Sequence, residues 1–89
     1  MNRMIRKIPD SFIETRIDDE LVLVQVDRGT FHSLKSSGLA IWDLIDGTRD
    51  RPAIVAALAR EFDVAPEQCD AEVLRFLDQL HKAGLVVLD

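Results

Sequence analysis

The sequence has 89 residues, a net charge of −5 and 47% hydrophobic content, values typical of one small globular domain. Its 16 acidic residues outnumber 11 basic ones, which disfavours a nucleic-acid partner because phosphate contacts require lysine and arginine. The single cysteine, Cys69, excludes an internal disulfide and a cysteine-rich zinc site. No stretch approaches the roughly 20 apolar residues of a membrane span or forms a signal peptide, so we expect a cytoplasmic protein.

The first part of the chain predicts strands. Residues 1–10 lack a clear period and end in Pro9-Asp10, so we expect a flexible N-terminal arm ahead of a domain over residues 11–89. Strand-like composition follows over residues 12–17, 21–26 and 30–34, with turns at Asp18-Asp19 and Asp27-Arg28-Gly29. Three strands joined by such short connections predict an antiparallel meander.

The second part of the chain predicts helices. The apolar spacing indicates helices over residues 39–45, 50–62 and 66–83, the last ended by Gly84. Residues 85–88 form an apolar tail that is either a strand fragment or a segment packed on the core. Three strands followed by three helices in so short a chain predict an α+β fold of the winged helix-turn-helix type, with the helices on one face of the sheet.

Catalytic and cofactor sites lack their usual ingredients in this sequence. His32, Cys69 and His81 are too few and wrongly spaced for a metal site, and the four glycines stand apart, so no phosphate loop is expected. Paired acidic residues fit turns or the first turn of a helix. Trp42, between Ile41 and Ile45, is a core residue by its spacing. We therefore expect no enzymatic activity, no metal and no cofactor.

Two features suggest a surface for a partner. Helices cover only one face of such a sheet, and the third strand is a candidate open edge that can accept an added peptide strand. On the third helix, a second stripe lies beside the core face, and its apolar member Leu74 is either a groove residue or a boundary residue of the core. This stripe consists of Asp70, Leu74, Asp78 and His81, adjacent to Leu77.

The order of these segments resembles the PqqD-like family. The matching pieces are Thr30-Phe31-His32-Ser33-Leu34, Ala40-Ile41-Trp42, Leu44-Ile45-Asp46-Gly47, residues 54–58, Phe62-Asp63-Val64, and Val73 through Gly84-Leu85. Together they cover roughly residues 20–86. Many relatives carry Asn at the position of Lys35 and a polar cap at that of Ala65, so the departures concern helix capping.

The resemblance implies a non-catalytic adaptor, a RiPP recognition element. Such a domain binds the leader of a ribosomally made precursor peptide as a strand beside the third strand and presents it to a separate enzyme. That enzyme is a radical S-adenosylmethionine enzyme in pyrroloquinoline quinone synthesis, or a leader peptidase in lasso peptide pathways. The peptide-binding residues that we predict are Thr30, Phe31, His32, Ser33, Leu34, Asp70, Leu74, Leu77, Asp78 and His81.

Two other functions compete with this interpretation. A DNA-binding winged-helix regulator would use Arg49, Arg51 and Arg60, but acidic residues are interleaved with them, which weakens phosphate contacts. A structural subunit would pack on an enzyme complex without touching peptide. Neither the precursor nor the pathway follows from the sequence.

Overall fold

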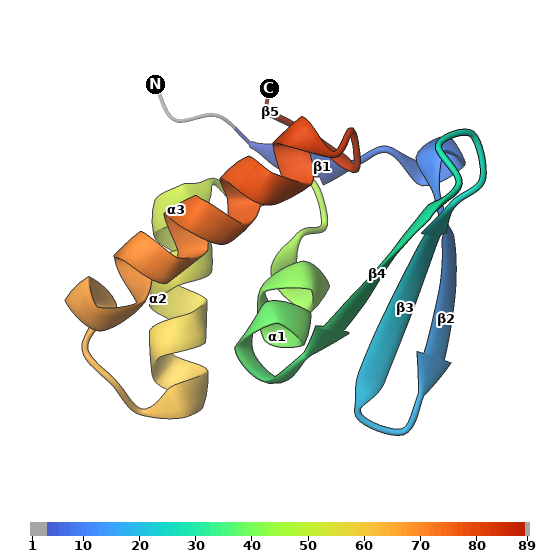
Figure 1. The fold of residues 1–89 in the computed structure, drawn as a ribbon. Coiled ribbons are helices and arrows are strands. Elements are labelled where there is room, and N and C mark those ends of the chain that lie inside the picture. Colours follow the sequence, from blue (N-terminus) through green and yellow to red (C-terminus); the bar gives the residue numbers. More distant parts are fainter. Residues whose placement is uncertain (1–3, 89) are drawn as a thin grey trace.

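The fold is a three-stranded sheet followed by three helices (Figure 1). The computed structural model describes residues 4–88. Strands β2 (Ile13–Ile17), β3 (Glu20–Gln25) and β4 (Thr30–Lys35) form an antiparallel sheet in the order β2-β3-β4. The helices then follow as α1 (Ser36–Leu44), α2 (Arg51–Phe62) and α3 (Pro66–Lys82). The predicted winged-helix arrangement is confirmed.

A second, two-stranded sheet joins the two ends of the chain. Strand β1 (Ile5–Lys7) pairs antiparallel with β5 (Val86–Leu88), and the 3₁₀ turn η1 (Pro9–Ser11) leads on to β2. Ile5 is buried, and its backbone N–H donates to the carbonyl of Arg49 at 3.0 Å. The arm expected over residues 1–10 is therefore docked from Met4 onward, and its residues 1–3 lie outside the described part.

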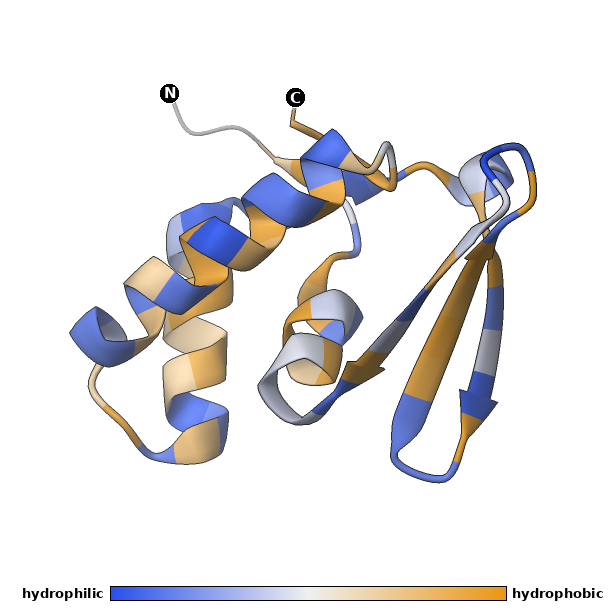
Figure 2. Ribbon diagram, in the orientation of Figure 1, coloured by the Kyte–Doolittle hydropathy of each residue, from blue (hydrophilic) through white to orange (hydrophobic). Residues whose placement is uncertain are grey.

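The two faces of the main sheet differ in how far their side chains are buried. Leu21 and Leu23 point toward the helices and are buried, whereas Val22 and Val24 on the other face are partly exposed. This alternation follows from the pleat of a strand, in which successive side chains point to opposite faces. Hydrophobic residues run along β3 (Figure 2). One face of the sheet is thus anchored in the core, and the other is open.

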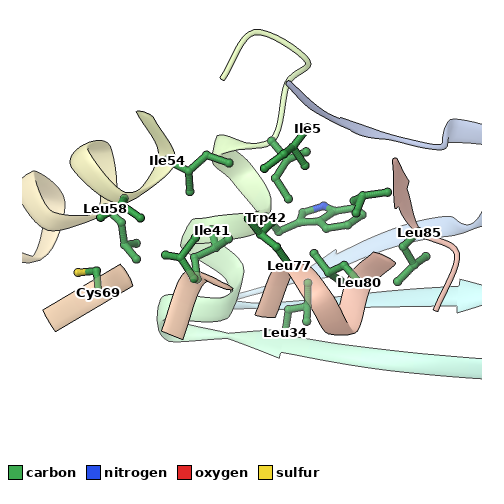
Figure 3. Close-up of a cluster of buried hydrophobic side chains, with 14 of the residues drawn as sticks. Ile5, Leu34, Ile41, Trp42, Ile54, Leu58, Cys69, Leu77, Leu80 and Leu85 are labelled. Carbon is green, nitrogen blue, oxygen red and sulfur yellow. The ribbon is translucent and has the colours of Figure 1, made fainter. Parts of the chain in front are cut away.

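The core is centred on Trp42 of α1, which has no exposed surface. Its indole lies among buried aliphatic side chains from distant parts of the chain, including Ile5, Leu80 and Leu85 (Figure 3). The indole Nε1–H donates to the Glu14 carboxylate at 2.9 Å. Trp42 therefore belongs to the core as predicted. The spacing of Ile54, Val55, Leu58 and Phe62 predicts one apolar stripe on α2, but Phe62 lies in the last turn of this helix and is nearly half exposed.

The two ends of α3 have well-defined structures that hold this helix in place. At its start, Ala65 offers no side-chain acceptor, and instead the Gln68 side chain accepts a hydrogen bond from the Ala65 N–H at 3.2 Å. At its end, the N–H groups of Gly84 and Leu85 donate to the carbonyls of His81 and Leu80, each at 3.0 Å. This Schellman ending needs a left-handed residue, and Gly84 supplies it with φ of 79°. This ending leads the chain from α3 into β5.

Candidate functional site

Strand β4 is an edge of the sheet, and its outward backbone groups can be assigned from the register. Ile17 and Glu20 close the two-residue turn between β2 and β3, so they form a hydrogen-bonded pair. Alternation along β3 and β4 then turns the N–H and C=O of His32 and Leu34 toward β3. Those of Phe31 and Ser33 point away from it. Within residues 4–88 the sheet has no strand beyond β4, so these outward groups are placed to pair with an added strand.

A hollow of about 430 Å³ lies between this edge and α3. Most of its wall is hydrophobic, and the polar groups come from His32, Ser33 and Gln79. We call it the β4–α3 groove, and its lining residues are His32, Ser33, Leu34, Phe76, Gln79, Leu80, Ala83 and Leu85. An open strand edge beside an apolar hollow of this size suits an extended peptide that brings apolar side chains.

The groove continues toward the start of α1. A second hollow of about 380 Å³ shares Phe76 and Gln79 with the first and extends to Gly38, Glu72 and Arg75. A strand that follows β4 past Lys35 would reach this region, because α1 begins at Ser36. The two hollows therefore form one track along α3, with its apolar part beside β4 and its charged part at the far end.

A buried glutamine joins β3, β4 and α3 at one end of the groove. The Gln25 side chain donates to the Ala83 carbonyl at 2.7 Å and accepts from the Thr30 hydroxyl at 3.2 Å. Its Oε1 also lies 2.8 Å from His32 Nε2, so the imidazole donates from that nitrogen. Our sequence interpretation missed Gln25. The available signal was a polar residue in the inward register of the strand, two positions after Leu23.

The predicted site residues fall into two separate groups in the structure. Thr30–Leu34 form the β4 edge, and three of these five residues line the groove. Leu77 is buried in the core. The stripe of Asp70, Leu74, Asp78 and His81 does not line the groove, because about 100° per residue turns it roughly opposite to Phe76, Gln79 and Ala83. The structure therefore does not bring the β4 edge and this stripe together.

Local contacts define the surroundings of this stripe. Asp70 lies 3.5 Å from Arg51 of α2, and Asp78 forms an ion pair with Lys82 at 3.1 Å. Leu74 is 50% exposed. Through Asp70 the stripe lies on the α2 side of α3, whereas the side toward β4 carries Phe76 and Ala83.

The other edge of the sheet borders a hollow of about 330 Å³ whose lining includes five charged residues, Arg16, Asp18, Asp19, Asp43 and Glu61. On β2, the inward Glu14 accepts from Trp42, and Arg16 donates to Asp43 of α1 at 2.7 Å. This hydrogen bond raises the pKa of the Arg16 guanidinium. Because these polar contacts occupy the inner side of β2, peptide side chains would meet charged groups there rather than an apolar wall. The hollow beside β4 therefore offers apolar side chains a less charged lining than the hollow beside β2.

Within residues 4–88, no group of three or more His, Cys, Asp or Glu side chains is placed to hold a metal ion. No helix in this part of the chain has the length and apolar character needed to cross a membrane. Arg49 bonds to Asp46 at 2.9 Å and Arg51 lies near Asp70, so two of the three arginines considered for DNA contacts have acidic neighbours.

Comparison with known families agrees with this geometry. The model of the family described as "Coenzyme PQQ synthesis protein D (PqqD)" matches residues 20–86. The chain belongs to the PqqD family. Among its curated relatives are two named "PqqA binding protein", from Xanthomonas axonopodis pv. citri (strain 306) and Xanthomonas euvesicatoria pv. vesicatoria (strain 85-10). The first is 33% identical over 75 residues, which cover 84% of this chain and 79% of the relative. The second is 34% identical over 73 residues, covering 82% and 77%.

Solved structures with the same fold include two complexes with peptides. One, "TbiB1 in Complex with the TbiA(beta) Leader Peptide", is 31% identical with a TM-score of 0.79, over 90% of this chain and 93% of that chain. The other, "Lasso peptide synthetase B1 complexed with the leader peptide", has a TM-score of 0.80 over 94% and 98%. At 15% identity, the second likeness concerns the fold alone.

Proposed function

We propose that this member of the PqqD family is a non-catalytic adaptor that binds the leader of a ribosomally made precursor peptide. The observation that carries the proposal is the open β4 edge beside the apolar β4–α3 groove. The names of the Xanthomonas relatives and the leader complex of TbiB1, each above 30% identity, support peptide as the ligand.

Binding would combine two kinds of contact. The outward backbone groups of Phe31 and Ser33 would hydrogen-bond to the leader, whatever its side chains. Leader residues opposite His32 and Leu34 would point into the groove, because directly paired residues in a sheet share a face. There they would meet Phe76 and Leu80, which select for apolar side chains. Affinity near micromolar, about −8 kcal/mol, is expected because ordering a flexible leader offsets much of the contact energy.

The bound precursor would then be presented to a modifying enzyme in the cytoplasm. The candidates are a radical S-adenosylmethionine enzyme and a leader peptidase, as the family resemblance implies. An adaptor of this kind holds the leader and leaves the rest of the precursor free to enter the enzyme. The proposal therefore requires no catalytic group on this chain.

The first test removes one backbone donor from the β4 edge. Ser33→Pro deletes an N–H that points away from β3, so the sheet should persist, since proline is tolerated on edge strands. Synthetic PqqA and TbiA(beta) leader peptide are titrated into isotope-labelled native chain and variant, with chemical shifts as the readout. We expect the native chain to bind at least one peptide through β4 signals, and Ser33→Pro to lose at least tenfold in affinity. Ser33→Ala, which keeps the N–H, should bind like the native chain.

The second test separates the two sides of α3. Phe76→Glu places a charge in the groove, and Leu74→Glu places the same charge on the α2 side of the helix. We expect the first to abolish binding and the second to leave it within twofold. If Leu74→Glu instead blocks the peptide while Phe76→Glu binds normally, the site is the stripe first predicted from the sequence. If neither peptide perturbs β4 in the native chain, the proposed function fails.

A further inference from the structure

The face of the sheet turned away from the helices carries an apolar row that ends at the open edge. The register pairs Ile13 with Val24 and Val24 with Phe31, so the three side chains lie side by side across β2, β3 and β4. Phe31 is 73% exposed and Ile13 is 57% exposed. The next row, Thr15, Val22 and Ser33, is less apolar. A single exposed apolar residue is ordinary, but an aligned row is a patch that usually has an occupant.

The position of Phe31 indicates what covers it. Its side chain is the last of the row, and its backbone groups face the empty position beyond β4. A strand added at this edge must itself alternate, whichever way it runs. If every second residue enters the β4–α3 groove, the residues between them fall on the outer face. One of those residues then lies directly beside Phe31 and extends the row to a fourth strand.

We propose that the Phe31 side chain is a second specificity determinant, which selects an aromatic or β-branched apolar residue of the bound leader on the face opposite the groove. This inference rests on the proposed function and extends it. Aromatic and β-branched cross-strand pairs contribute about 0.2–1 kcal/mol each, which corresponds to roughly a 1.4-fold to 5-fold change in affinity. The leader is thus read on both faces, with apolar groove residues on one side and an apolar partner of Phe31 on the other.

The test is a selection of twelve-residue random peptides displayed on phage, carried out in parallel on three chains. These are the native chain, Phe31→Thr and Ile13→Thr. Both substitutions remove an exposed apolar side chain from the same row and keep a residue that favours strands, so both variants should fold. They differ in distance from the β4 edge, because Ile13 lies two strands away.

We expect the native chain to enrich alternating sequences with apolar residues at groove positions and one outer apolar position. Phe31→Thr should lose the outer preference, keep the groove preference and bind the best native peptides about threefold to fivefold more weakly. Ile13→Thr should select and bind like the native chain. If the native chain enriches apolar residues at groove positions and Phe31→Thr selects and binds the same peptides, this inference is wrong, but the proposed function stands.

Two other outcomes also overturn it. Equal losses on Phe31→Thr and Ile13→Thr would mean that a partner covers the whole outer face rather than a strand at its edge. Sedimentation tests the simplest such partner, a second copy of the chain, by showing whether both variants abolish a native dimer. If no peptide is enriched on the native chain, the proposed function fails together with the inference.

Discussion

Replacing Trp42 by alanine should remove a large share of the stability of this domain. A buried indole contributes roughly 150–250 Å² of apolar surface, worth about 4–6 kcal/mol at 25 cal/mol per Å². Core Trp→Ala substitutions cost about 3–5 kcal/mol, and the residue here has 0% exposure, so the upper part of that range applies. A domain of this size has about 5–10 kcal/mol in total. The variant should therefore be only marginally folded at 25 °C.

The surroundings of Trp42 predict a graded series rather than a single loss. Phe12 packs edge-on against the indole at 5.2 Å between ring centroids, and Lys7 Nζ lies 4.4 Å from the ring centroid. Trp42→Phe keeps most of the packing but loses the hydrogen bond to Glu14, so it should cost about 1–2 kcal/mol. Glu14→Gln, which keeps an acceptor on an exposed strand, should cost less than about 1 kcal/mol.

Urea denaturation followed by far-ultraviolet circular dichroism measures this series, since tryptophan fluorescence is lost in two of the variants. Leu74→Ala is the control for a large-to-small change at an exposed position and should shift the midpoint little. A Trp42→Ala midpoint close to the native one would refute the assignment of Trp42 to the centre of the core. An equal loss for Trp42→Phe and Trp42→Ala would show that the hydrogen bond to Glu14, not the packing, carries the stability.

Two further predictions concern polar groups. Gln25→Leu leaves the Ala83 carbonyl and the His32 imidazole without their shared partner. The variant should therefore lose about 1–3 kcal/mol of unfolding free energy, measured by urea denaturation, and the NMR signals of the His32 ring should shift. Unchanged stability and unchanged ring signals would contradict the bridging role of Gln25. Hydrogen bonds from Thr48 hold the pKa of Asp46 below its ordinary 3.8. This stabilising contribution is therefore present above pH 3.8 and lost as pH falls through the lower folded pKa. The difference in unfolding free energy between the native chain and Asp46→Asn should decrease as pH falls below 3.8. A difference independent of pH would contradict this role of Asp46.

Local patterns were sufficient for the main sheet and the helices. The run of β-branched and aliphatic residues at 21–24 favours a strand, and the two-residue Asp18-Asp19 turn sets the register. Asp50 caps α2 by accepting from the Ala53 N–H at 2.9 Å, as its type and position predict. Gly84 ends α3 for an equally local reason.

Local sequence patterns do not predict the pairing of β1 with β5. Three residues at each end of the chain form this sheet, and neither segment is long enough to show a period. Each becomes a strand only because the other lies beside it and because Ile5 enters the core cluster that includes Trp42. A tertiary contact between residues about 80 positions apart decides the structure of both. For that reason the sequence interpretation described a loose arm where the chain is docked.

The sequence also does not determine which flank of α3 borders β4, and this question decides the lining of the β4–α3 groove. Helical periodicity places Val73, Leu77 and Leu80 on one line of α3, and all three are buried. Periodicity alone does not decide which flank of this line borders a partner, the one with Leu74 or the one with Cys69 and Phe76. Only the position of β4 relative to the helix distinguishes them, and that depends on how α1 turns the chain between sheet and helices. The bridge from Gln25 to the Ala83 carbonyl brings the second flank to the strand edge. A peptide that pairs with β4 must therefore meet Phe76, while Leu74 faces away from it.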